Sequence, residues 1–146
     1  MVFAIEPQTS GINISLHTQG LFKHSKRLIR AREIALRGII AANNYAASLR
    51  DLHLFEEARS LLRKVIPTAQ RVLGEDNYLT LLLKKKFAQS LYRDDGATLD
   101  DLREAVTTLE ETERIARRVL SGAHPLTTTL EDDLQDARAA RDALQK

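Results

Sequence analysis

Residues 45–80 contain Y-A-A-S-L, F-E-E-A-R-S-L-L and V-L-G-E-D-N-Y-L-T in that order, and residues 87–127 contain F-A-Q-S-L, L-R-E-A-V-T-T-L and V-L-S-G-A-H-P-L-T. Self-similarity at a period of about 20–50 residues is typical of stacked structural repeats. In such proteins each repeat packs only against its neighbours. The doubled stretch therefore predicts a repeat array.

The spacing of the two copies shows how the repeat is built. Ala46 recurs as Ala88, a shift of 42 residues, whereas Ala58 recurs as Ala105, a shift of 47 residues. The five additional residues fall at 94–98, in a D-D-G-A-T segment that is typical of a loop. Because an insertion between helices leaves each helix intact, we expect a helix–turn–helix unit of about 42 residues.

Hydrophobic residues recur at helical spacing along most of the chain. We expect an all-α fold, an antiparallel helical hairpin array of about five helices that forms a right-handed α-α superhelix of two and a half repeats. The expected helices span about 22–52, 55–73, 78–93, 99–120 and 126–144. Residues 1–20 alternate apolar and polar side chains at Ile12–Leu16, so we expect an irregular or extended N-terminal arm before a repeat domain over 21–146.

Four short stretches resemble the tetratricopeptide repeat in its longer, kinesin-light-chain-like form. They are Asn43-Asn44-Tyr45-Ala46, Phe55-Glu56-Glu57-Ala58, Arg71-Val72-Leu73-Gly74 and His124-Pro125-Leu126-Thr127. The resemblance covers about residues 35–140, although His53 stands where this family has glycine at the turn between helices. It implies a non-catalytic module that binds proteins or peptides on a concave face lined by the first helix of each hairpin.

Composition and charge limit the possible functions. The chain has 146 residues, no cysteine and a formal net charge of +2, so it forms no disulfide or thiolate-bound metal site. Residues 1–50 carry seven Lys and Arg against two Asp and Glu, which makes the N-terminal part basic. No apolar run is long enough for a membrane span, and the N-terminus lacks the pattern of a signal peptide. We therefore expect an intracellular, cytoplasmic location.

The chemistry of an active site is missing from the sequence. The four histidines have no spacing that places two of them on one helix face as a metal pair, and there is no G-x-S-x-G motif or glycine-rich phosphate loop. The carboxylate clusters lie in a loop and on a charged helix face, where they suit turns and helix starts. We therefore expect no enzyme activity, no cofactor and no metal.

The basic run at residues 84–86 marks a candidate groove. The repeat register places Lys85 at the position that Asn43 occupies one copy earlier and Asp132 one copy later. Helical steps from these positions give a polar face that we expect to hold an extended or acidic peptide. The candidate groove residues are Asn43, Ala47, Arg50, Lys85, Gln89, Tyr92, Arg93 and Asp132. An exposed basic strip without a fixed ligand explains the same pattern.

These observations favour a protein–protein interaction module or scaffold that binds a peptide or helix, with an acidic partner as one option. Two alternatives stay open: a purely structural fragment of a longer repeat protein, and an electrostatic binder of nucleic acid or anionic membrane through the basic N-terminal helix. That helix carries Lys23, Lys26, Arg27, Arg30, Arg32 and Arg37, without a motif for specific nucleic-acid recognition. Because a short array leaves apolar ends uncovered, we also expect a homo-oligomer or docking to further repeats.

Overall fold

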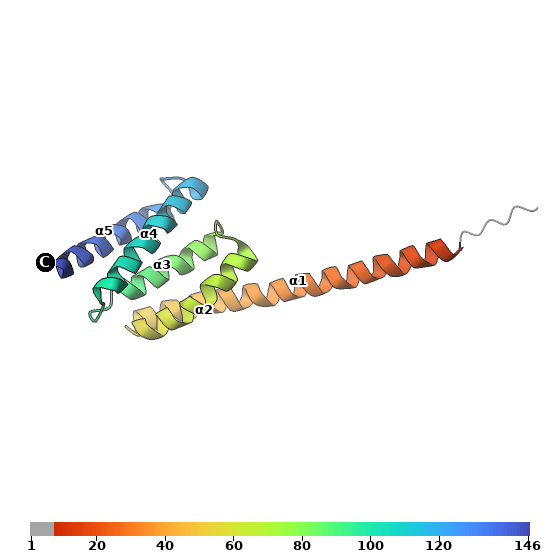
Figure 1. The fold of residues 1–146 in the computed structure, drawn as a ribbon, viewed down its shortest axis with the longest axis horizontal. Helices are drawn as coiled ribbons and strands as arrows, with labels where there is room; N and C mark the ends of the chain where they lie inside the picture. The colour runs from red at the N-terminus through yellow and green to blue at the C-terminus, as the bar shows by residue number, and fades with distance from the viewer. Residues whose placement is uncertain (1–7) are drawn as a thin grey trace, which may run out of the picture. The chain divides into compact units, whose positions relative to one another are not determined.

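The computed structural model describes the backbone of residues 8–146 and the side chains of residues 16–146, and within that range the chain is built from helices. They are α1 (Gln8–Asp51), α2 (Phe55–Leu73), α3 (Tyr78–Tyr92), α4 (Leu99–Leu120) and α5 (Pro125–Gln145) (Figure 1). No strand occurs in the described range. The expected all-α helical repeat array with five helices is therefore confirmed, and four of the five helices begin and end within one residue of their expected positions.

The expectation for the N-terminal arm is wrong where the structure describes it. α1 begins at Gln8, so residues 8–20 are helical and not extended, whereas residues 1–7 lie outside the described residues. The alternating pattern is only five residues long, and a strand needs a partner strand to satisfy its backbone. Adding turns to an existing helix, by contrast, requires no new nucleus.

The chain divides into two compact units, with the boundary between Ala35 and Leu36. This boundary falls inside α1 and 15 residues later than the expected end of the N-terminal arm. Residues 16–34 are exposed, and the first buried side chain along the described chain is Ile39. The second unit, Leu36–Lys146, contains the last turns of α1 together with α2, α3, α4 and α5.

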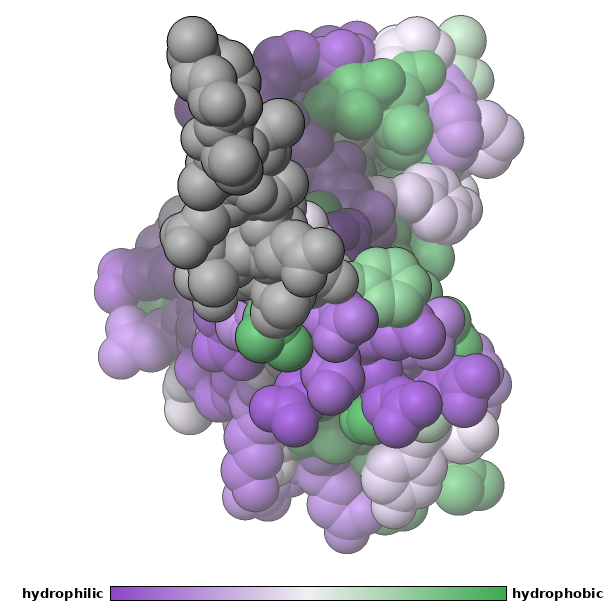
Figure 2. All heavy atoms as spheres, turned by 90° about the vertical axis from the view of Figure 1, so that its right-hand side faces the viewer, coloured by the Kyte–Doolittle hydropathy of each residue, from purple (hydrophilic) through white to green (hydrophobic). Residues whose placement is uncertain are grey.

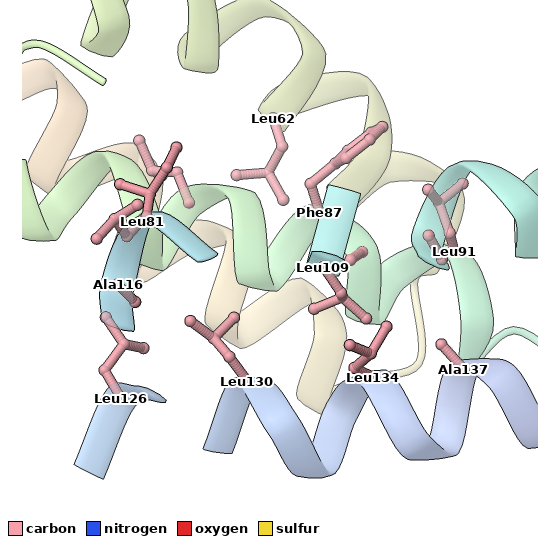
Figure 3. Close-up of a cluster of buried hydrophobic side chains, with 14 of the residues drawn as sticks. Leu62, Leu81, Phe87, Leu91, Leu109, Ala116, Leu126, Leu130, Leu134 and Ala137 are labelled. Atoms are coloured by element: carbon pink, nitrogen blue, oxygen red, sulfur yellow. The ribbon is translucent and has the colours of Figure 1, made fainter. Parts of the chain in front are cut away.

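Consecutive helices of the second unit pack as antiparallel neighbours. α2 packs on α3, α3 on α4 and α4 on α5, and α3 also contacts α5. The recurring sequence positions form the interior, since Ala58 and Ala105 are 1% and 0% exposed and Leu62 and Leu109 are both fully buried. Figure 3 shows Leu62, Phe87 and Leu109 among the side chains that fill the space between helices. The equivalent residues of the two copies thus build one continuous core.

The helix starts are fixed by local hydrogen bonds that the sequence encodes. Asn77 accepts a hydrogen bond from the Leu79 backbone amide at 2.9 Å and so caps α3. Thr98 and Asp101 form a reciprocal capping box at the start of α4, with N–O distances of 3.1 and 2.9 Å. The His124 ring caps α5 through a 3.0 Å bond from the Leu126 amide. These caps satisfy amides that have no partner inside the helix.

Three residues with positive φ shape the connections between helices. His53 has φ 59°, which is the left-handed conformation that glycine adopts most easily. Gly74 follows α2 with φ 95° and ψ 162°, and Ser121 follows α4 with φ 98° and ψ 159°. Gly74 and Ser121 are equivalent positions of the two copies, so the second copy places a serine in a conformation suited to glycine.

Hydrophilic side chains dominate the face seen in Figure 2, with smaller hydrophobic areas between them. Ion pairs join α2 to its neighbours, including a two-bond pair between Arg63 and Glu104 with N–O distances of 3.1 and 3.0 Å. Arg59 also pairs with Asp94 at 3.2 Å, which fixes the inserted loop of the second copy against α2.

Candidate functional site

Side-chain hydrogen bonds connect the alternate helices α1, α3 and α5 directly. From α3, Lys86 Nζ donates to Asn43 Oδ1 on α1 at 2.5 Å. The Arg50 guanidinium on α1 donates to Gln89 Oε1 on α3 at 2.7 Å. On the other side of α3, Lys85 Nζ donates to Thr129 Oγ1 of α5 at 3.0 Å. We call this polar face of the array the inner surface.

Asp133 on α5 is the buried carboxylate of the inner surface, at 5% exposure. It accepts hydrogen bonds from Gln89 Nε2 at 2.9 Å and from the Tyr92 hydroxyl at 2.5 Å. The Arg93 guanidinium lies 3.5 Å from it and Lys85 Nζ lies 3.9 Å from it. A buried charge is tolerated only when it is paired and hydrogen-bonded, and Asp133 meets both conditions.

Lys85 and Lys86, two of the three lysines of α3, lie in an unfavourable environment for their charge. Burial lowers the pKa of Lys86, and the nearby charges of Arg50 and Lys85 lower it further, while Asp51 opposes them. Burial also lowers the pKa of Lys85, although Asp133 partly offsets that effect. The hydrogen-bond acceptor of Lys86 is the neutral amide oxygen of Asn43. An additional negative charge at this place would stabilise both ammonium groups.

Tyr92 and Arg93 form the end of the inner surface at α3. Burial and the hydrogen bond to Asp133 raise the pKa of Tyr92, which keeps the phenol protonated and donating. The Arg93 guanidinium lies 5.7 Å from the centre of the Tyr92 ring, and its side chain remains 44% exposed. Arg93 therefore combines a fixed position with a side that is open to solvent.

A shallow pocket of about 280 Å³ lies beside this end of the inner surface. It is lined by Arg50, Asp51, His53, Phe55 and Arg93. The Arg50 guanidinium already pairs with Asp51 at 3.2 Å and donates to Gln89, so Arg93 is the more exposed cation of the pocket, and Phe55 supplies an apolar wall. A guanidinium can bind a carboxylate through two parallel hydrogen bonds, so the pocket suits a negatively charged side chain.

The structure brings together most of the residues that the sequence predicted for the groove. The residues that take part in the hydrogen bonds and ion pairs of the inner surface are Asn43, Arg50, Lys85, Gln89, Tyr92 and Arg93. Ala47 is half-buried on α1 and has no polar side-chain atom. Asp132 is exposed, whereas its neighbour Asp133 accepts hydrogen bonds from Gln89 and Tyr92 of α3. Of the acidic pair, Asp133 and not the expected Asp132 therefore lies on the inner surface.

Sequence reasoning missed Lys86, Thr129 and Asp133. Neighbouring residues on a helix point about 100° apart, so an error of one position moves a side chain to a different face. Lys86 belongs to the basic run that the sequence marked, and Asp133 belongs to the marked acidic pair. The sequence showed the charged clusters that contain Lys86 and Asp133, but not which residue of each cluster points toward the neighbouring helix.

The described residues contain no sign of a metal site or of a membrane span. In residues 16–146, no three His, Asp or Glu side chains are grouped so that they could hold a metal ion. Nor does any helix of the described chain combine the length and apolar character needed to cross a bilayer.

Comparisons with known proteins add one match. No curated protein and no solved structure matches the chain significantly. A protein-family model described as tetratricopeptide repeat matches residues 39–78, which hold the end of α1, all of α2 and the first residue of α3. Repeats of this architecture use an extended concave surface to bind other proteins. This chain therefore contains a repeat of the tetratricopeptide type, the building block of protein-interaction and scaffold modules.

Proposed function

We propose that the inner surface binds a peptide segment that carries carboxylate side chains. The observation behind this proposal is the environment of Lys86, a half-buried cation whose acceptor is a neutral amide and whose neighbours Arg50 and Lys85 are also cations. Such a group gains more from a bound anion than an exposed lysine does, because the anion replaces lost hydration and offsets repulsion.

The pocket between Arg50 and Arg93 supplies a second contact for the same peptide. Lys86 and the pocket both lie along α3 and the end of α1, so one extended segment can reach both. A peptide with two acidic residues would place one carboxylate near Lys86 and the other beside the exposed guanidinium of Arg93. Phe55 in the pocket wall would contact the apolar part of the second side chain.

A purely structural role for the inner surface is the main alternative. The hydrogen bonds that connect Arg50, Gln89 and Asp133 already join three helices, and such a chain of bonds stabilises the array without a ligand. The two roles differ at Lys86, because a structural network gains little from a cation whose pKa is lowered by its surroundings. Neutralising Lys86 therefore distinguishes a role of the inner surface in peptide binding from a role in stability alone.

Selection of peptides from a random displayed library on the full chain tests the proposal. We expect the selected peptides to be enriched in Asp and Glu, and we expect Lys86→Gln to weaken their binding at least fivefold. Lys64→Gln is the matched control, because Lys64 is exposed on α2 and carries the same charge. Peptides without acidic enrichment, or equal binding by both variants, would refute the proposal.

A further inference from the structure

The described part of the first unit, residues 16–35 of α1, carries an apolar face. Leu21 and Leu28 are seven residues apart, as are Phe22 and Ile29, so all four side chains point to the same side of the helix. Their exposed fractions are 54%, 58%, 61% and 61% in that order. Four large apolar side chains on one face are therefore in contact with solvent.

The opposite face of the same helix turns is basic. Lys23, Lys26, Arg27 and Arg30 follow the i, i+3, i+4, i+7 spacing that places side chains on one face, and all four are exposed. Residues 16–35 contain a single acidic residue, Glu33. Lys26 also lies over the Phe22 ring, 4.5 Å from its centre, at the border of the two faces. The segment is thus amphipathic and strongly cationic.

We propose that residues 21–30 of α1 bind the surface of membranes that contain anionic lipids. A helix with an apolar face and a face rich in Lys and Arg lies in the plane of the interface, with its apolar side chains among the acyl chains. Long basic side chains then extend upward to the phosphate groups, and each basic residue contributes through attraction to anionic lipid.

The charge and the apolar area of residues 21–30 together favour an anionic lipid surface as the binding partner of this segment. Nucleic acid would pair with the four cations but leave Leu21, Phe22 and their neighbours in water. An apolar groove on a protein would cover the apolar face but give the cations no partner. An anionic lipid surface accommodates both faces at once.

The extent of the apolar face predicts weak and reversible binding. Arg32 follows Ile29 on the same side of the helix, so the apolar face ends there. The segment from Leu21 to Arg30 is about 15 Å long at 1.5 Å per residue. Such a short helix holds only a few apolar side chains in the interface, and binding therefore depends on the negative charge of the lipids.

Sedimentation of the full chain with lipid vesicles tests the proposal. We expect binding to vesicles of phosphatidylcholine and phosphatidylserine, and little binding to phosphatidylcholine alone. Arg27→Gln with Arg30→Gln removes two of the four charges and should weaken binding about 30-fold, at about 1 kcal/mol per basic residue. Leu21→Ser with Phe22→Ser keeps the charge and should weaken binding at least tenfold.

A matched control and a fluorescent reporter make the result specific. Lys64→Gln with Arg71→Gln removes two exposed charges from α2 and should leave vesicle binding unchanged. Because the chain has no tryptophan, Phe22→Trp introduces a single reporter whose emission should shift to shorter wavelength on anionic vesicles. Gln19→Trp places the reporter on the basic side and should shift much less.

Three results would overturn the proposal. The first is equal binding to vesicles with and without phosphatidylserine, or none to either. The second is tight binding to duplex DNA that the Leu21→Ser, Phe22→Ser variant retains, without vesicle binding, which would assign the cations to nucleic acid. The third is a concentration-dependent shift of the Phe22→Trp emission without lipid and no further change on anionic vesicles, which would assign the apolar face to a second copy of the chain.

Discussion

Replacing Ser121 by glycine is expected to stabilise the repeat unit. Ser121 follows α4 with φ 98° and ψ 159°, a region of backbone space that is essentially limited to glycine. The equivalent residue of the first copy, Gly74, adopts nearly the same angles without a side chain. The serine therefore holds a strained conformation that its counterpart avoids.

The expected change in the free energy of unfolding follows from two opposing contributions. Strain of this kind costs about 1–3 kcal/mol, and a glycine in the unfolded chain costs about 0.4–1 kcal/mol of folding free energy through its greater freedom. Ser121 contributes to its surroundings through its backbone carbonyl, which accepts from the Thr127 hydroxyl at 2.8 Å and from the His124 amide at 3.4 Å. Glycine keeps both bonds, so we expect a net gain of about 1 kcal/mol.

Gly74→Ala is the reciprocal variant. A Cβ atom at Gly74 would meet no heavy atom within 4 Å, so the substitution tests the backbone alone. We expect it to lower the free energy of unfolding by about 1–2 kcal/mol, because alanine is strained at φ 95°.

Urea and thermal unfolding followed by far-ultraviolet circular dichroism measure both variants. A change of about 1 kcal/mol corresponds to about 4 °C in Tm for a unit of this size. Ser121→Gly should raise Tm and Gly74→Ala should lower it. The reasoning is refuted if Ser121→Gly leaves the free energy of unfolding unchanged or reduced while Gly74→Ala causes no loss.

Two further predictions concern a helix cap and a buried phenol. Thr98→Ala removes the capping box of α4 and should cost about 1 kcal/mol in urea unfolding, whereas Thr98→Ser keeps the hydroxyl and should restore most of it; equal losses would argue against the cap. The raised pKa of Tyr92 means that folding favours the protonated phenol, so its stabilisation is complete below the ordinary pKa near 10 and is lost as pH rises above it. Wild type should therefore lose more stability than Tyr92→Phe between pH 9 and about 11, and parallel pH profiles of Tm would contradict this assignment.

Much of the fold follows from local sequence information. The apolar positions Ala58 and Leu62 repeat at helical spacing, and the loops contain helix-ending residues such as Gly74 and cap residues such as Thr98. These signals act within a few residues, so helices α2 to α5 could be placed almost to the residue. The start of α1 was misplaced because the short alternating pattern near Ile14 was given more weight than the continuing helix.

The candidate site was only partly predictable. The sequence marked the basic run that contains Lys85 and the acidic pair that contains Asp133, because such clusters stand out by composition. Which member of each cluster faces the next helix depends on the rotation of α3 and α5 about their axes, and packing sets that rotation. Self-association of the array stays a prediction.

By itself, the sequence determined that this protein is an array of helical hairpins, because the spacing of apolar residues and the caps are local properties of the chain. Only the tertiary structure decided that Asp133 and not Asp132 turns toward α3, and that Lys86 is left half-buried among other cations. Burial and the charges of neighbouring helices depend on residues about 40 positions apart in the chain, such as Asn43 and Lys86. No local pattern in the sequence encodes contacts between residues so far apart, and the inner surface is built from such contacts.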